Sequence, residues 1–164
     1  ARVLSSKEPH AMNEIIKSSE LPSLVGQEPE PSSWLEITQD RVNRFADATN
    51  DHQFIHVDLE RAARTPVGGT IAHGYLTLSL IPFLTAENLP AFEGLVMAIN
   101  YGSDKVRFLQ PVRVGSRVRS RQKYLEVLEK KPGQWLIRSL VTIEIENEAK
   151  PALIAETLAL FILN

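Results

Sequence analysis

Two short segments carry most of the side chains in this sequence that could do acid–base chemistry. In the first, residues 50–56, the carboxylate of Asp51 lies five positions before the imidazole of His56. In the second, residues 68–75, Gly74 stands where a strongly apolar segment begins. A carboxylate, an imidazole and an exposed backbone N–H are the groups needed to move a proton beside a polarised carbonyl. The two segments therefore predict a single acid–base site.

The residue types by themselves leave three interpretations of the first segment open. Asp51 can simply accept local N–H groups after a helix, as short polar side chains near helix ends often do. His52 and His56 have the i, i+4 spacing of two metal ligands, with His73 or a distant carboxylate as a third. The glutamate of the zinc-protease motif is missing, and we expect no metal. In the third interpretation, Asp51 and His56 hold one water between them, and His56 takes or gives a proton near neutral pH.

Gly74 is the candidate for binding the carbonyl oxygen. The sequence predicts a helix over residues 71–88, apolar on nearly every face and therefore buried, with Pro82 kinking it or marking its later end. The first N–H groups of a helix lack partners within the helix and lie at the positive end of its dipole. The Gly74 N–H can thus hold an oxygen that gains negative charge, and glycine allows a ligand to approach closely. His73 fits better as a structural side chain that fixes this turn.

Composition excludes several function classes. The chain has 164 residues and a net charge of −2, which gives no reason to expect nucleic acid or an anionic membrane as a partner. It has no cysteine, so disulfides, thiolate nucleophiles and thiolate metal sites are excluded, and a cytoplasmic location is expected. The most apolar stretch, residues 75–84, is too short to span a bilayer.

The first half of the chain predicts an arm, then helices joined by loops. Residues 1–33 are expected to form an N-terminal arm, because prolines interrupt any long helix or strand. Within it, residues 1–11, before Met12, are expected to be a tag remnant or a processed end, and 18–31 lack the apolar core of a signal peptide. The remaining expectations are a helical turn or two at 13–18, a strand at 34–37, a helix from the N-cap Thr38 to about 49, and a short helix capped by Asp58 and ending near 64.

The loop at residues 50–57 matters for the site. On a straight helix Asp51 and His56 would point in different directions, and on a strand they would face opposite sides. They meet only if the backbone turns between them, so this stretch must be irregular.

The second half predicts long antiparallel strands with a period-two alternation of apolar and polar residues. The expected strands cover 94–100, 104–108, 116–129, 135–146 and 152–163. A sheet wrapped around the apolar helix gives a single α+β domain over residues 34–164. Such a sheet leaves an edge that pairing with a second copy would protect, which favours a homodimer.

The motifs resemble those of the MaoC-like hydratase family, and most closely its nodulation protein N-like branch. The resemblance rests on residues 45–58, on the Ile-Ala-His-Gly run at 71–74, and on residues 100–102, 105–108 and 111–115. It covers roughly residues 25–163. It implies the hot-dog fold, in which an antiparallel sheet wraps a long helix, and a dimer.

The resemblance also implies an activity, that of an (R)-specific enoyl-CoA hydratase acting on an acyl-CoA thioester without a cofactor. By motif, Asp51 and His56 become the catalytic dyad and the Gly74 N–H the site for the thioester oxygen. The expected substrate contacts are Gly69, Thr70, His73, Asn100, Tyr101, Gly102 and Arg107, the last for the CoA phosphates. Two alternatives stay open: a hot-dog acyl-CoA thioesterase, and a subunit that binds acyl thioesters without turning them over.

Overall fold

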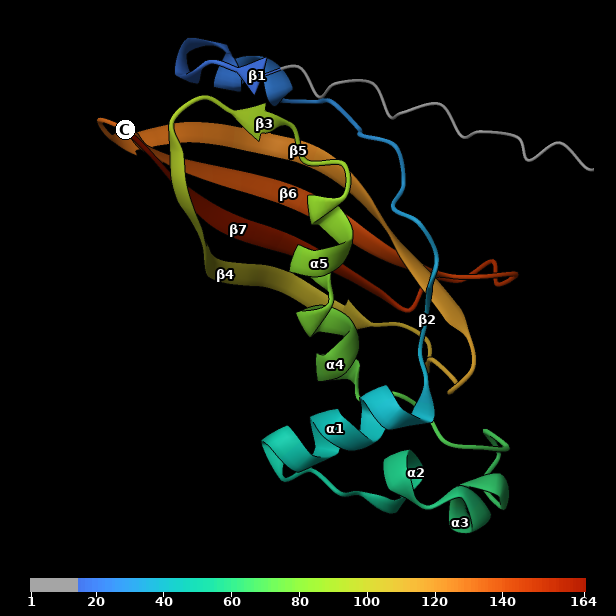
Figure 1. The fold of residues 1–164 in the computed structure, drawn as a ribbon. Helices are drawn as coiled ribbons and strands as arrows, with labels where there is room; N and C mark the ends of the chain where they lie inside the picture. Colours follow the sequence, from blue (N-terminus) through green and yellow to red (C-terminus); the bar gives the residue numbers. More distant parts are fainter. Residues whose placement is uncertain (1–14) are drawn as a thin grey trace, which may run out of the picture.

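The largest element of the structure is a five-stranded antiparallel sheet. The structure is a computed structural model that describes residues 15–164. The sheet curls around one side of two short helices (Figure 1). Its strands, in spatial order, are β2 (Leu35–Glu36), β5 (Arg117–Lys131), β6 (Gln134–Ile145), β7 (Leu153–Leu163) and β4 (Leu95–Phe108). A separate pair of short parallel strands joins β1 (Ile15–Ile16) to β3 (Ala91–Phe92). The prediction of an α+β fold is confirmed.

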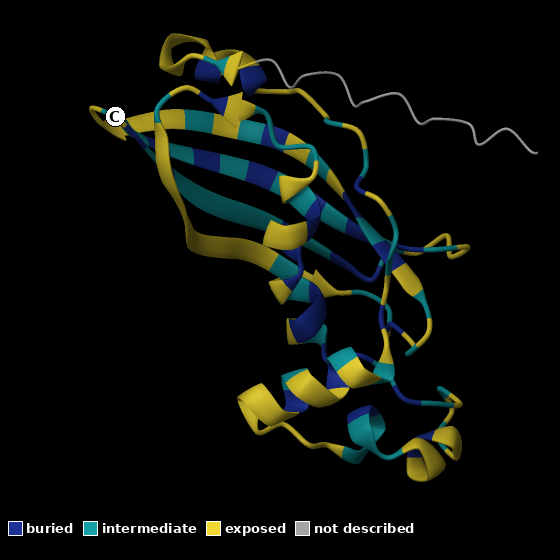
Figure 2. Cartoon of the chain, viewed as in Figure 1, coloured by how far each residue is buried: buried dark blue, intermediate teal, exposed yellow. Residues whose placement is uncertain are grey.

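The period-two pattern locates the long strands correctly. Residues of β6 alternate between buried and half-buried along the whole strand, as expected for a strand with one face in the core (Figure 2). The turn between β5 and β6 requires Gly133, because its φ is +73° and a Cβ there would lie 2.6 Å from the Leu163 carbonyl oxygen. The expected strands at 94–100 and 104–108 are one strand, β4, because its pairing with β7 continues across the gap with a register shift between Asn100 and Gly102.

The helices that precede the site follow their capping signals. Helix α1 (Gln39–Thr49) begins after Thr38, whose side chain accepts the Arg41 N–H, and helix α3 (Leu59–Ala63) begins after Asp58 in the same way. The expectation that residues 50–57 are wholly irregular is wrong. Residues 54–57 form one helical turn, α2 (Phe54–Val57), because the loop reverses direction within residues 50–53.

The apolar segment at 71–88 is not one helix. It forms α4 (Gly74–Ser79) and α5 (Ile81–Ala86), which meet at Leu80, and Pro82 lies in the first turn of α5, where its missing N–H costs no hydrogen bond. Nor is it buried on all sides. Tyr75 is 68% exposed and Phe83 is 65% exposed, so one apolar face of this helix pair is uncovered in the single chain.

Residues 15–33, part of the expected arm, pack against one end of the sheet. A 3-10 helix, η1 (Ser18–Leu24), buries Leu21 and Leu24 in a second apolar cluster with Trp135 and Phe161. The helical turn expected at 13–18 is not found in the described residues, since Ile15 and Ile16 form β1. The expectation for residues 1–11 lies outside the described residues.

The main core lies between the sheet and α4–α5, and includes Leu76, Ile81, Val141 and Leu153. Strand β4 forms the free edge of the sheet and remains largely exposed. Within residues 15–164, no helix is long and apolar enough to cross a membrane.

Candidate active site

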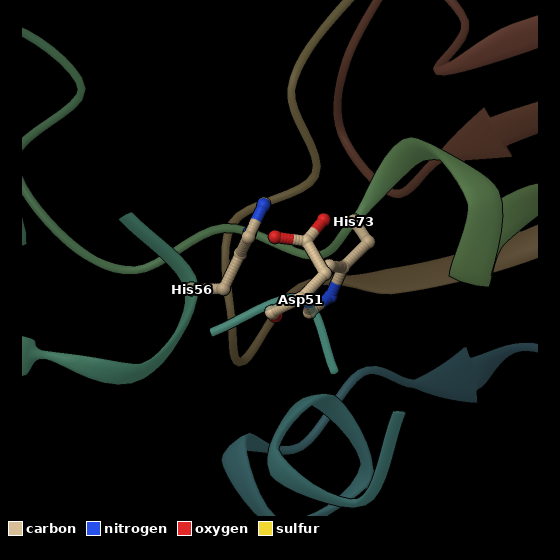
Figure 3. A group of neighbouring side chains, drawn as sticks. All are labelled: Asp51, His56 and His73. Atoms are coloured by element: carbon tan, nitrogen blue, oxygen red, sulfur yellow. The ribbon is translucent and has the colours of Figure 1, made fainter. Parts of the chain in front are cut away.

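A sharp reversal after α1 brings Asp51 to His56. Asn50 ends the helix with φ +57°, a left-handed conformation that asparagine tolerates better than most residues. The chain then re-enters a helical turn at α2, which carries His56. A carboxylate oxygen of Asp51 and a ring nitrogen of His56 lie within 4.8 Å of each other (Figure 3), which is close enough for one water to bridge them. The predicted meeting of these two side chains is therefore present.

A hydrogen bond to the backbone fixes the tautomer of His56. Its ring lies 2.7 Å, through Nδ1, from the Ile71 carbonyl oxygen, so Nδ1 donates and Nε2 is left to accept a proton. Only 6% of the residue is exposed, and this desolvation lowers the pKa of His56 below its ordinary value, against the opposing effects of the Ile71 bond and Asp51. Asp51 is exposed, and its carboxylate accepts a weak 3.4 Å bond from the Gln53 N–H.

His73 lies close to both Asp51 and His56 (Figure 3). Its ring stacks on that of His56 at a centroid distance of 3.7 Å, and its Nε2 donates to the Asp51 backbone carbonyl at 2.9 Å. It is 3% exposed. His73 therefore contacts both members of the pair: it stacks on the ring of His56 and donates to the backbone carbonyl of Asp51.

The same stacking is unfavourable for a shared metal ion. Asp51, His56 and His73 offer ligand atoms within 4.8 Å of one another. However, the two rings are only 23° from parallel, and an imidazole nitrogen binds a metal in the plane of its ring. Two nearly parallel rings direct their lone pairs side by side rather than toward one point.

A polar relay that the sequence analysis missed fixes the backbone of His56. Gln39 donates its amide to the His56 carbonyl at 2.8 Å and accepts the Thr70 hydroxyl at 2.6 Å. Thr70, an expected substrate contact, is 7% exposed and serves this relay. No sequence signal marks Gln39, because it lies on α1, 17 residues from His56, and only the fold brings them together.

Gly74 lies at the edge of a hollow of about 340 Å³ that also includes His56, Tyr75 and Phe108. Its N–H donates to no group in residues 15–164, because it is the first residue of α4. A Cβ at this position would lie 3.0 Å from two ring carbons of Phe108. Close packing against Phe108 therefore favours glycine here, although the ring is a side chain that could shift.

The other expected substrate residues lie elsewhere. Asn100, Tyr101 and Gly102 are on β4 and line a second, larger hollow of about 540 Å³. Arg107 is exposed, donates to the Val106 carbonyl and makes no ion pair within the described part of the chain. Gly69 lies in the loop before Thr70, with open space around it. The fold therefore gathers Asp51, His56, His73 and Gly74, and leaves Arg107 and Gly69 outside both hollows.

Comparison with known proteins identifies close relatives. The chain is 49% identical to nodulation protein N of Rhizobium meliloti over 146 residues, which cover 88% of this chain and 91% of that protein. It is 46% identical to 3-hydroxyacyl-thioester dehydratase Z of Mycobacterium tuberculosis over 144 residues, 88% of this chain and 95% of the relative.

Solved structures agree on the fold. An (R)-hydratase of Pseudomonas aeruginosa superposes with a TM-score of 0.70 at 26% identity, covering 85% of this chain and 83% of the hydratase. The (R)-hydratase of A. caviae gives 0.68 at 26% identity, with 82% and 94% covered. The hot-dog fold and the similarity to nodulation protein N are thus confirmed. Since the sequence pattern of the MaoC-like domain matches residues 20–147, this chain belongs to the MaoC-like dehydratase family.

Proposed function

We propose that this protein is an (R)-specific enoyl-CoA hydratase, which also runs in reverse as a 3-hydroxyacyl-CoA dehydratase. The observation that carries the proposal is the grouping of three chemical parts. Asp51 and His56 lie within water-bridging distance, and the unpartnered Gly74 N–H lies on the same hollow as His56. The names of the dehydratase and hydratase relatives support the same reaction class.

The reaction needs no cofactor. The Gly74 N–H donates to the thioester carbonyl oxygen, which gains negative charge as water adds to C3. His56 Nε2 accepts one proton from that water, while Asp51 holds the water and stabilises the imidazolium that forms. His56 then returns the proton to C2, so that water is added across the double bond and the enzyme is regenerated. The product is a (3R)-3-hydroxyacyl-CoA.

Arg107 is the proposed contact for the CoA phosphates. It is exposed on β4, close in sequence to Phe108, whose ring borders the hollow at Gly74. Arginine binds phosphate oxygens through two N–H groups at once. Replacing Arg107 with alanine should raise KM for CoA thioesters and leave kcat unchanged.

We also propose a homodimer that pairs along β4. This strand is the long free edge of the sheet, and its exposed apolar residues include Val96, Met97 and Ile99. Uncovered edges of this kind are usually paired or protected in native proteins. The exposed rings of Tyr75 and Phe83 on the neighbouring helices would be covered by the same contact. Sedimentation velocity should give twice the mass of the chain, and a monomer at micromolar concentration would refute the dimer.

The reaction is tested by following the enoyl-thioester absorbance with crotonyl-CoA. We expect loss of the band and an (R)-3-hydroxy product on chiral analysis. Asp51→Asn should lower kcat by about 100-fold or more, since it removes the negative charge that holds the water and stabilises the imidazolium, with little change in shape. The matched control is Asp47→Asn, which changes an exposed carboxylate on α1 that pairs with His52.

Three other results would reject this function. Release of free CoA without hydration would indicate the thioesterase. Tight binding without turnover would indicate a non-catalytic subunit. Wild-type activity in Asp51→Asn would show that the dyad is not the catalytic pair.

A further inference from the structure

A row of hydroxyl groups crosses the concave face of the sheet inside the larger hollow. Tyr124 on β5 pairs with Ser139 on β6, Ser139 pairs with Thr157 on β7, and Thr157 pairs with Ser103 on β4. Directly paired residues point to the same side of a sheet. All four line the hollow of about 540 Å³, which α5 covers from the other side (Figure 1).

The hydroxyl row borders apolar residues. In the next row toward η1, Ile137 pairs with Ala159 and Ala159 with Asn100 on the edge strand, and beyond it Trp135 pairs with Phe161. The row is buried at one end, where Tyr124 is 1% exposed and Ser139 is 2% exposed. At the other end Ser103 is exposed on the edge strand. Hydroxyl groups are costly to bury without partners, so this row needs an explanation.

Two donors in this row have no acceptor within residues 15–164. The Tyr124 hydroxyl is buried and makes no hydrogen bond. Ser139 Oγ accepts the Gln122 amide at 3.0 Å, which leaves its own proton available. Desolvation raises the pKa of Tyr124 to about 12, so the phenol remains a neutral donor at physiological pH.

From this arrangement we infer that the larger hollow binds the distal part of the acyl chain and selects chains that carry an acceptor oxygen, as a ketone or hydroxyl, far from the thioester. Tyr124 and Ser139 would donate to that oxygen, and the Ile137 and Ala159 row would contact the methylene groups beside it. The inference rests on the proposed function and adds the class of acyl chain.

The position of the hollow fits a chain that starts at the catalytic pair. The smaller hollow includes Gly74 and Thr77, and the larger one begins at Leu78 and Ser79 on the same helix. At about 1.5 Å of helix rise per residue, Leu78 lies roughly 6 Å along the axis from Gly74. On β4, Ser103 and Phe108 pair with Thr157 and Leu153 on β7, four residues apart, which is about 13 Å at 3.3 Å per residue. The acceptor oxygen must therefore lie many bonds beyond the thioester carbonyl.

The test compares trans-2-decenoyl-CoA with its counterpart that carries a ketone on the penultimate carbon, using crotonyl-CoA as a substrate too short to reach the row. In the wild type we expect kcat/KM to be about fivefold higher for the ketone, the factor that corresponds to one net hydrogen bond of about 1 kcal/mol. Tyr124→Phe should abolish the preference and Ser139→Ala should reduce it. Neither should change the rate with crotonyl-CoA. Thr142→Val, on the opposite face of β6, is the control and should retain the preference.

Equal kcat/KM values for the two long substrates in the wild type, or a preference that survives both variants, would overturn the inference. Failure to hydrate crotonyl-CoA would instead reject the proposed function. In that case, calorimetric binding of saturated decanoyl-CoA and its ketone counterpart still decides the question. Fivefold tighter binding of the ketone, lost in Tyr124→Phe, supports the subsite, and equal Kd values refute it.

Discussion

Replacing Gly74 with alanine should separate the chemical role of this position from its structural one. The added Cβ would lie 3.0 Å from Phe108 Cδ1 and Cε1, so the ring must move by a few tenths of an ångström. Phe108 is 47% exposed and has room to move outward. Alanine also favours the helix by at most about 1 kcal/mol over glycine. The two effects oppose each other, so the free energy of unfolding should change by less than about 1 kcal/mol, or about 2–4 °C in Tm.

The effect on catalysis should be much larger. The new methyl group lies at the wall of the hollow from which a thioester oxygen must reach the Gly74 N–H. A displacement of about 1 Å between reacting groups can cost roughly 100-fold. We therefore expect kcat/KM for crotonyl-CoA hydration to fall about 100-fold while Tm is nearly constant.

The assay combines thermal unfolding with initial rates from the enoyl-thioester absorbance. Phe108→Leu is the control, because it removes the ring that the methyl group would displace but leaves Gly74 intact. If Phe108→Leu loses as much activity as Gly74→Ala, the effect comes from the ring and not from the N–H. If Gly74→Ala keeps at least half of the wild-type activity, the assignment of this N–H to the thioester oxygen is refuted.

Four further predictions concern groups at this site and in the larger hollow. Because burial lowers the pKa of His56, kcat/KM should fall on the acid side with an apparent pKa below 6.5, and an acid limb above 6.5 would contradict the neutral-base assignment. The folded state then binds fewer protons than the unfolded state, so the free energy of unfolding should decrease as the pH falls through 6.5, and His56→Gln should remove this component. Gln39→Ala leaves the buried Thr70 hydroxyl and the His56 carbonyl unpaired, which should lower the free energy of unfolding in urea by about 1–3 kcal/mol. Thr38→Ser, which keeps the adjacent cap, should lower it by much less, and equal losses would refute the relay. Tyr124→Phe should leave the protein equally or more stable, since the lost hydroxyl has no partner in residues 15–164, and should remove the tyrosine that titrates near pH 12 by ultraviolet absorbance. A clear loss of stability would mean that the hydroxyl is satisfied.

Local signals in the sequence were enough to predict most of the elements and the proximity of Asp51 and His56. The helices begin after Thr38 and Asp58 because each side-chain oxygen accepts a backbone N–H in the first turn. This signal is local, since donor and acceptor are three residues apart. The alternation of apolar and polar residues along 134–145 predicted β6, because side chains of a strand point alternately to its two faces. The separation of Asp51 and His56 required a turn between them, and the residues around them form a motif specific enough to indicate the family.

Tertiary structure decided what depends on residues far apart in the chain. The exposure of Tyr75 and Phe83 follows from which faces the sheet covers, and periodicity does not contain that information. The link from Gln39 to His56 spans 17 residues, and the hydroxyl row joins four strands through their register. A sequence determines which groups are available and how its neighbouring residues turn. Which groups share a hollow, and which of them are left without a partner, is set by strand register and packing between distant segments.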